Sequence, residues 1–256
     1  MADWDAIIAE PQYAGRRVFS VMQDGERYWV KRSSKNYKNL YQIVLYPNLS
    51  ALRDEARAMR SLRLQGMLVP SVVHEAPEFI VLTDVGESLQ RYLQHGDDPV
   101  RMQYVLQVAD LLSDLHGRKA WHGNAALRNF TLKDGQLGMI DFENTAHRWC
   151  TLNVRQAFDI WQVLNSIAKY EERKLLSNAF LERYRPPSRS LLYLRIIAWS
   201  MFPVYLLLAP FSRFLKRDIH HVSAGITPAC EIFPSLRAVR DRICVGPRRC
   251  TRMGRS

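Results

Sequence analysis

Cysteine is scarce in this sequence and is not arranged in pairs. The 256 residues include only four cysteines, and none belongs to a C-x-x-C motif. This usage fits reduced thiols in a reducing compartment. A zinc site built from the C-terminal cysteines and a neighbouring histidine would match no standard ligand spacing. The residues concerned are Cys230, Cys244, Cys250 and His220 or His221. We therefore expect neither a disulfide framework nor a zinc site.

An export signal and a long apolar run are also missing. Met1 to Glu10 contains acidic residues and no apolar stretch, unlike a secretory signal. Ile196 to Phe211 has sixteen uncharged residues, fewer than the roughly 20 of a spanning helix, and prolines interrupt it. Three interpretations remain open for this segment. The favoured one is a buried helix or helix pair, and the others are a segment in a membrane interface and, last, a spanning helix. We expect a cytoplasmic protein. A second expectation is that it contacts the anionic inner membrane peripherally.

Positive charge is concentrated at one end of the chain. The formal net charge is +11, and residues 185–256 hold 13 of the 36 Lys and Arg residues but only three of the 25 Asp and Glu residues. No aromatic residue lies between Arg237 and Ser256, and no nucleic-acid reader motif is present. We expect a disordered basic tail over 235–256. Nucleic acid is not an expected partner.

The first part of the chain has the pattern of a small antiparallel sheet with one helix. Arg17 to Arg32 places β-prone residues on both sides of an Asp-Gly turn, which predicts a hairpin. Ser50 precedes an apolar stripe at helical spacing, so it is a candidate N-cap. Two short apolar runs, Val69 to Val73 and Phe79 to Thr83, predict two further strands.

The second part of the chain has the sequence pattern of a mainly helical lobe. An apolar face begins at Val100 and ends near His116, which predicts a long helix. A second hairpin is predicted from two short strands, and two more helices follow it. These segments are Phe130 to Leu132, Leu137 to Ile140, Arg155 to Lys169 and Glu171 to Tyr184. We expect an α+β protein with an N-terminal lobe at 1–86, a helical lobe at 87–234 and the tail at 235–256.

Three separated motifs place charged or amide side chains on these elements. Lys31 ends a predicted strand, and Glu55 lies on the next helix. His122 opens the segment H-G-N-A-A-L-R-N, which ends at Asn129, and Asp141 follows the second hairpin in the sequence I-D-F-E. This order resembles the protein-kinase pattern of strand lysine, helix glutamate, H-x-D-x-x-x-x-N loop and metal-binding aspartate. The resemblance implies a two-lobed protein-kinase-like fold.

The resemblance also implies a cofactor set and roles for these residues. Lys31 would bind the α- and β-phosphates of ATP, and Glu55 would hold its ammonium in position. Asn129 and Asp141 would supply hard oxygen ligands to Mg²⁺. Asp84, within the segment L-T-D-V-G-E-S-L, is expected to contribute to cofactor binding.

Among kinase-like families, the chain resembles the bacterial lipopolysaccharide core kinases, which are the heptose and Kdo kinases and their InaA-type relatives. The resemblance runs from about Gly15 to Lys169. The metal motif also resembles that of choline and aminoglycoside kinases.

Asp159 resembles the buried helix aspartate that fixes the catalytic loop in this fold. Only about 18 residues separate it from Asp141, too few for a peptide-docking activation segment. This favours a glycolipid or other small-molecule acceptor, phosphorylated on a sugar hydroxyl.

The sequence departs from the kinase pattern at two places. No glycine-rich phosphate loop is present, since the region of the first hairpin offers only Gly15 and Gly25. Asn124 stands where the family places its catalytic aspartate, and an amide oxygen can orient an acceptor hydroxyl but cannot take its proton. Two hypotheses stay open. One is a slow kinase with Asn124 and His122 as catalytic residues, and the other is a nucleotide-binding pseudokinase or scaffold.

Overall fold

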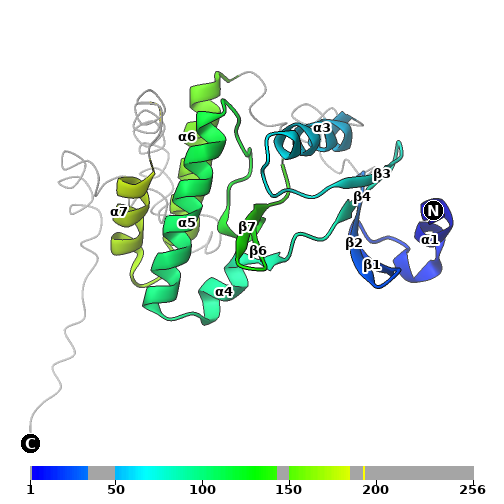
Figure 1. The fold of residues 1–256 in the computed structure, drawn as a ribbon, viewed down its shortest axis with the longest axis horizontal. Coiled ribbons are helices and arrows are strands. Elements are labelled where there is room, and N and C mark those ends of the chain that lie inside the picture. Colours follow the sequence, from blue (N-terminus) through cyan, green and yellow to red (C-terminus); the bar gives the residue numbers. More distant parts are fainter. Residues whose placement is uncertain (1, 34–49, 143–149, 185–192, 194–256) are drawn as a thin grey trace, which may run out of the picture.

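The computed structural model describes residues 2–33, 50–142, 150–184 and 193. Figure 1 shows a smaller lobe built on a β-sheet and a larger lobe of helices, with a short hairpin between them. The expected mixed fold, a small antiparallel sheet with a helix followed by a mainly helical lobe, is confirmed.

The first predicted hairpin is present. Strand β1 (Val18–Gln23) pairs antiparallel with β2 (Glu26–Arg32). The turn residues Asp24 and Gly25 have φ of 54° and 78°. Positive φ at both central turn positions matches the twist of the flanking strands, which is why the Asp-Gly pair closes this hairpin.

Two further strands complete a four-stranded sheet in the order β1-β2-β4-β3. Strand β4 (Phe79–Thr83) coincides with the prediction, whereas β3 (Val72–Glu75) begins later than the predicted Val69. Pro70 explains the difference, because proline has no N–H to donate to a strand ladder.

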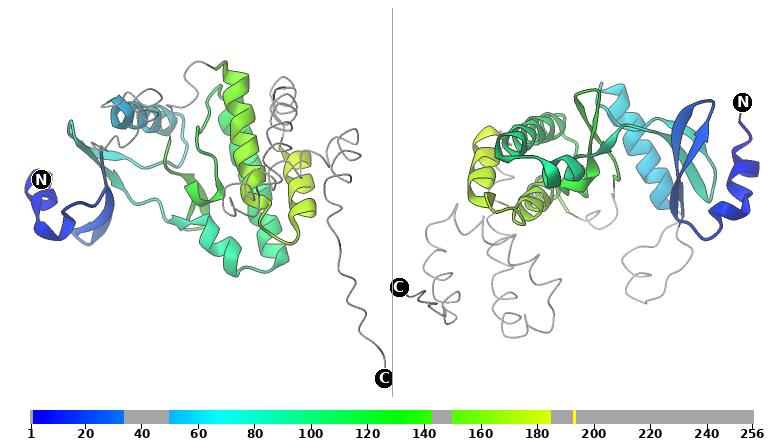
Figure 2. Two further views of the ribbon diagram at one scale, coloured as in Figure 1. Left: turned by 180° about the vertical axis from the view of Figure 1, so that it is seen from behind. Right: turned by 90° about the horizontal axis from the view of Figure 1, so that it is seen from below.

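Helices cover both faces of this sheet. Helix α3 (Ser50–Leu64) packs against one face, and helix α1 (Trp4–Ala9), which the sequence did not predict, lies on the other. Figure 2 shows the two helices on opposite sides of the strands. Trp4 and Ile8 of α1 are buried against Val30 and its neighbours. Consequently Val30 faces α1, and the next residue, Lys31, faces the opposite side.

The larger lobe contains the predicted helices and second hairpin. Its elements are β5 (Glu87–Ser88), α4 (Leu89–His95), α5 (Asp98–Gly117), the 3-10 turn η2 (Leu127–Asn129), β6 (Phe130–Lys133), β7 (Gln136–Met139), α6 (Leu152–Ile167) and α7 (Arg173–Arg183). Helix α5 starts two residues before the predicted Val100, because the Asp97 carboxylate accepts a hydrogen bond from the amide of Val100. Helices α5, α6 and α7 share one hydrophobic core with α3.

Two close backbone contacts join the lobes beside the linker from β4 to β5. The amide of Met139 in β7 donates to the carbonyl of Leu68 at 3.0 Å. Gly86 has φ of 98°, and a side chain there would lie 2.2 Å from the carbonyl oxygen of Leu132. Only glycine fits at this position, so the linker approaches the hairpin closely.

Several sequence expectations lie outside the described residues. They concern the apolar segment 196–211, the basic tail 235–256, most of the region 185–234 and the cysteines 230, 244 and 250. Among the helices in the part of the chain that the structure describes, none is both long enough and apolar enough to cross a membrane.

Candidate active site

Lys31 lies at the centre of a buried ion cluster. Its ammonium is 2.8 Å from the carboxylate of Glu55 on α3 and 2.6 Å from Oδ1 of Asp141. The side chains of Lys31 and Glu55 are 13% and 6% exposed, and that of Asp141 is 30% exposed. The three charged groups predicted from separate motifs therefore meet at one point, although 110 residues separate Lys31 from Asp141.

Asp141 reaches this point through an unusual backbone conformation. It follows β7 with φ of 63°, which aspartate tolerates better than most side chains. The next residue, Phe142, is buried and stacks on His122 with 4.6 Å between ring centroids. The amide of Ile140, on the other side of Asp141, donates to the carbonyl of Asn129 at 2.9 Å. Asp141 is thus fixed from both sides while its carboxylate points to Lys31.

Two asparagines complete the polar side of the site. Asn124 donates from Nδ2 to Oδ2 of Asp141 at 2.8 Å. Asn129 donates from Nδ2 to the backbone carbonyl of Asn124 at 2.7 Å. The second contact uses the amide nitrogen of Asn129 and leaves its side-chain oxygen to act as an acceptor or a metal ligand.

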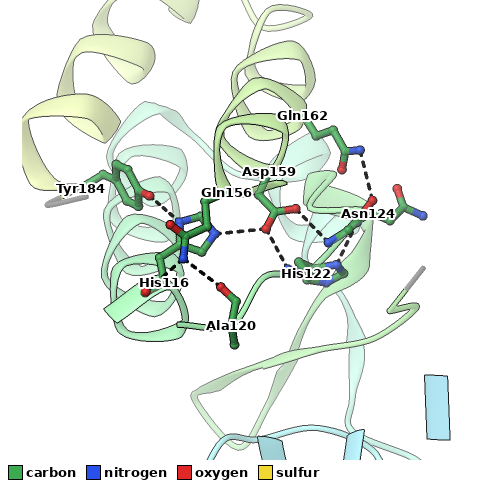
Figure 3. A network of polar contacts seen from close by, with 9 residues as sticks. His116, Ala120, His122, Asn124, Gln156, Asp159, Gln162 and Tyr184 are labelled. Atoms are coloured by element: carbon green, nitrogen blue, oxygen red, sulfur yellow. Dashed lines mark hydrogen bonds and ion pairs between the residues drawn. The ribbon is translucent and has the colours of Figure 1, made fainter. Parts of the chain in front are cut away.

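The carboxylate of Asp159 on α6 binds the backbone of the loop that carries Asn124. This buried carboxylate accepts from the amides of His122 and Gly123, at 2.7 and 2.8 Å, and contacts Nε2 of His116 at 3.1 Å. Figure 3 shows Asp159 between His116 and His122. Asp159 is 0% exposed, as is His122. Asp159 therefore anchors the loop, and the buried His122 ring accepts a hydrogen bond at Nδ1 from the backbone amide of Asn124 at 3.3 Å.

The network continues into residues that the sequence analysis did not select. Nδ1 of His116 contacts the hydroxyl of Tyr184. Gln156 donates to the carbonyls of His116 and Ala120, both at 3.1 Å. Burial and the nearby carboxylate of Asp159 raise the pKa of Tyr184, so its neutral hydroxyl can donate to His116. The one sequence signal was that His116 extends the apolar face of α5, four residues after Leu112.

A cavity of about 580 Å³ opens beside the ion cluster. This volume suits a small organic ligand. Its lining includes Val18, Trp29, Lys31, Glu55, Leu82, Asp84, Asn129, Thr131, Ile140 and Asp141. The carboxylate of Asp84 accepts a hydrogen bond from the indole N–H of Trp29 at 2.7 Å. Five of the seven predicted site residues thus line one cavity. Asn124 and His122 are not part of its lining, but Asn124 contacts the lining residue Asp141.

The ion cluster shifts the pKa values of its members. Burial by itself would lower the pKa of Lys31, but the carboxylates of Glu55 and Asp141 outweigh it and raise the pKa above 10.5. Burial would likewise raise the pKa of Asp141, yet the neighbouring ammonium holds it below 3.8. Burial lowers the pKa of His122, which keeps its imidazole neutral.

These shifts predict a pH dependence of stability. The stabilisation from Asp141 is present above its ordinary pKa of 3.8 and is lost as the pH falls through the lowered value. The contribution of Lys31 to stability is present below pH 10.5 and is lost as the pH rises through the raised pKa.

We expect Lys31→Met to lower the melting temperature by a constant amount from about pH 5 to 9, and by less in acid as the carboxylates become protonated. Thermal melts beside the exposed-site control Lys174→Met check this, and a decrease that persists unchanged in acid would contradict it.

Comparisons with known proteins indicate the family of the chain. Residues 2–184 match the profile of the "Lipopolysaccharide kinase (Kdo/WaaP) family". An uncharacterized protein from Haemophilus influenzae is 22% identical over 224 residues, which are 81% of this chain and 87% of that protein. A solved structure titled "WaaP in complex with acyl carrier protein" is 21% identical and has a TM-score of 0.45, with 79% of this chain and 86% of that chain covered. The family match covers well over half of the sequence and confirms the resemblance read from its motifs. The chain belongs to the lipopolysaccharide kinase (Kdo/WaaP) family.

Proposed function

We propose that this protein transfers the γ-phosphoryl group of ATP to a sugar hydroxyl of a lipopolysaccharide-type glycolipid. The observation that carries the proposal is the position of Lys31. Its ammonium is fixed by Glu55 and Asp141 at the wall of a cavity of nucleotide size. A fixed cation there can bind phosphate oxygens, and phosphoryl transfer depends mainly on positioning and on stabilisation of charge.

The donor atoms near Lys31 fit a magnesium ion. Asp141 offers a carboxylate, and Asn129 offers a side-chain oxygen because its nitrogen is bonded to the Asn124 carbonyl. Among the described residues, no group of three or more His, Cys, Asp or Glu residues could hold a metal ion. Two protein oxygens suit Mg²⁺, which takes its other ligands from phosphates and water. When bound, the ion would offset the negative charge of the transferred group.

In this proposal Asn124 positions the acceptor. Its Nδ2 donates to Asp141, which orients the side-chain oxygen, and that oxygen can accept a hydrogen bond from the acceptor hydroxyl. The buried His122 ring stacks on Phe142 and accepts a hydrogen bond from the amide of Asn124, so it acts as a positioning residue for the loop. The oxygen of the acceptor hydroxyl bonds to the γ-phosphorus as the bond to the β–γ bridging oxygen breaks, ADP leaves, and the proton of the hydroxyl passes to solvent. In a reaction with a loose transition state, this proton transfer contributes less than positioning.

The proposal also specifies which group accepts the phosphate and where in the cell the reaction occurs. A sugar hydroxyl of the glycolipid core would approach from the side of Asn124, at the cytoplasmic face of the inner membrane. Peripheral contact with anionic lipid would come from the basic C-terminal end, since each Lys or Arg near such a leaflet contributes about 1 kcal/mol.

Phosphate transfer from radiolabelled ATP to deacylated core oligosaccharide tests the proposal. The wild-type protein should label the oligosaccharide, and Asn124→Ala should lower kcat by roughly 10²-fold with little change in the KM for ATP, because it misplaces the acceptor. Asn178→Ala, an exposed asparagine on α7, is the matched control. No transfer by the wild type, with Asn124→Asp also inactive, would end the proposal.

The second candidate is a nucleotide-binding module without turnover, and Asn124 is the observation that favours it. An amide at this position cannot act as a general base, a role worth roughly 10²- to 10⁴-fold in rate. This candidate predicts that ATP raises the melting temperature while no phosphate is transferred. Transfer by the wild-type protein in the oligosaccharide assay excludes it.

A further inference from the structure

One face of helix α6 follows the loop that carries Asn124. Asp159 accepts hydrogen bonds from the amides of His122 and Gly123, and Gln162, three residues later, donates to the carbonyl of Gly123 at 3.4 Å. Figure 3 shows Asp159 and Gln162 on α6, both directed at this loop. Residues three or four apart lie on the same face of a helix, so this face of α6 runs alongside the loop.

The same face continues to Lys169, just beyond the end of α6. Ser166, on the next turn, accepts a hydrogen bond from the amide of Leu127 at 3.2 Å. Lys169 is three residues further, and the C-cap residue before it keeps a right-handed helical conformation. The helix spacing therefore brings Lys169 beside the following residue of the loop, which is Arg128.

Arg128 and Lys169 are cations without a counter-ion. In the described part of the chain, neither side chain pairs with a carboxylate. Arg128 is exposed, and the ammonium of Lys169 lies 5.2 Å from the centre of the Tyr170 ring. Burial and the nearby guanidinium of Arg128 lower the pKa of Lys169, so the two cations are within electrostatic reach of each other. Their repulsion is unfavourable, and a bound anion would relieve it.

Other cations of the larger lobe are compensated. Four arginines there have carboxylate partners: Arg91 with Glu87, Arg101 with Asp98 and Glu172, Arg118 with Asp114, and Arg183 with Asp110. The carboxylate of Glu172, which is close to Lys169 in the sequence, is thus engaged by Arg101 at 3.4 Å. Arg128 and Lys169 differ from these arginines in keeping two positive charges together and unpaired.

Arg128 is held close to the proposed reaction centre. The next residue, Asn129, lines the cavity and donates from Nδ2 to the carbonyl of Asn124 at 2.7 Å. The carbonyl of Arg128 accepts a hydrogen bond from the hydroxyl of Ser88, another residue of the cavity wall, at 2.8 Å. The loop therefore keeps Arg128 beside the cavity and near Asn124, the residue proposed to position the acceptor hydroxyl.

We propose that Arg128 and Lys169 bind an anionic group of the phosphoryl acceptor, a phosphate or carboxylate on a sugar that neighbours the phosphorylated one. The inference rests on the proposed function, because it names acceptor-binding residues of the same site. Guanidinium and ammonium groups both donate charge-assisted hydrogen bonds to such oxygens. The pair selects acidic oligosaccharides over neutral ones, and it acts on the affinity for the acceptor and not on that for ATP.

Equilibrium titrations with two probes, deacylated core oligosaccharide and ATP with Mg²⁺, test this inference. We expect Arg128→Gln and Lys169→Gln each to weaken oligosaccharide binding by about tenfold and to leave ATP binding within about twofold of the wild type. Both side chains lie at the surface, so the variants should fold. Arg16→Gln is the matched control, since Arg16 is an exposed arginine before β1 in the smaller lobe, and it should bind both probes as the wild type does.

Chemically altered oligosaccharide identifies the group that the two cations bind. Phosphatase treatment removes its phosphates, and reduction of its carboxyl groups removes its carboxylates. One of these treatments should weaken binding to the wild type by about tenfold or more, and it identifies the anionic group. The double variant of Arg128→Gln and Lys169→Gln should bind the native and altered forms equally, because the charges that distinguish them are gone.

The outcomes separate this inference from the proposed function. If the wild type transfers phosphate to the oligosaccharide while both single variants bind it with wild-type affinity, the inference alone is wrong. A double variant that prefers the native form as strongly as the wild type, or a wild type indifferent to both treatments, would also overturn it. An equal loss of ATP and oligosaccharide binding would indicate a structural role and contradict it. If the wild type binds ATP but not the oligosaccharide, the proposed acceptor is wrong and the inference fails with it.

Discussion

Replacing Asp141 with asparagine is expected to lower the rate of phosphate transfer by roughly 10³-fold while the protein stays folded. Within the described ranges of the larger lobe, the carboxylate of Asp141 is the charged side chain that contacts Lys31. In the proposed function, its loss removes the charged ligand that would hold Mg²⁺. Lys31 keeps its ion pair with Glu55 at 2.8 Å, and asparagine tolerates the backbone φ of 63°, so the fold should survive.

The matched control is Asp134→Asn. Asp134 lies at the tip of the β6–β7 hairpin, is exposed and has φ of 51°, so the two substitutions change the same atoms in similar backbone conformations. Steady-state kinetics at saturating ATP, together with thermal melts, measure the effect. Equal activity of the Asp141→Asn and Asp134→Asn proteins would contradict the assignment of Asp141.

The largest expected effect on stability comes from Asp159→Ala. The substitution leaves the buried amide of His122 and the half-buried amide of Gly123 without an acceptor, and it removes the partner of His116. Each unsatisfied buried group costs about 1–3 kcal/mol, so the free energy of unfolding should fall by about 3–5 kcal/mol. Activity should fall as well, because the backbone amide of Asn124 belongs to the same loop and contacts Nδ1 of His122.

Urea denaturation of Asp159→Ala beside Asp110→Ala measures this loss. Asp110 also bonds two groups, the guanidinium nitrogens of Arg183 at 2.7 and 2.9 Å, but it lies on the surface. Exposed ion pairs contribute little to stability, so Asp110→Ala should change the unfolding midpoint slightly. A smaller loss for Asp159→Ala than for Asp110→Ala would show that the buried network does not hold the loop.

Local chemistry in the sequence was sufficient to predict most of the elements. The Asp-Gly turns require positive φ, which marked both hairpins, and the apolar spacing of α3 and α5 marked the two principal helices. Helices α1 and α4 were not predicted. They have six and seven residues, and helices this short depend on tertiary packing rather than on a pattern of their own.

The site was predictable only where its residues belong to motifs with fixed order. Lys31, Glu55 and Asp141 were selected because each ends or follows a recognisable element, and the fold brings them together. Trp29 and Tyr184 carry no such signal. Their contacts with Asp84 and His116 span 55 and 68 residues, and they exist because the strand register and the packing of α7 place them there.

Calorimetric titration of ATP, with and without Mg²⁺, tests most directly whether Lys31 and Asp141 bind one triphosphate. The wild-type protein, Lys31→Met and Asp141→Asn should be compared under identical conditions. We predict magnesium-dependent binding to the wild type that either substitution weakens by about tenfold or more, because each removes a charged contact to the phosphates or the ion. Equally tight ATP binding by all three proteins would contradict this assignment.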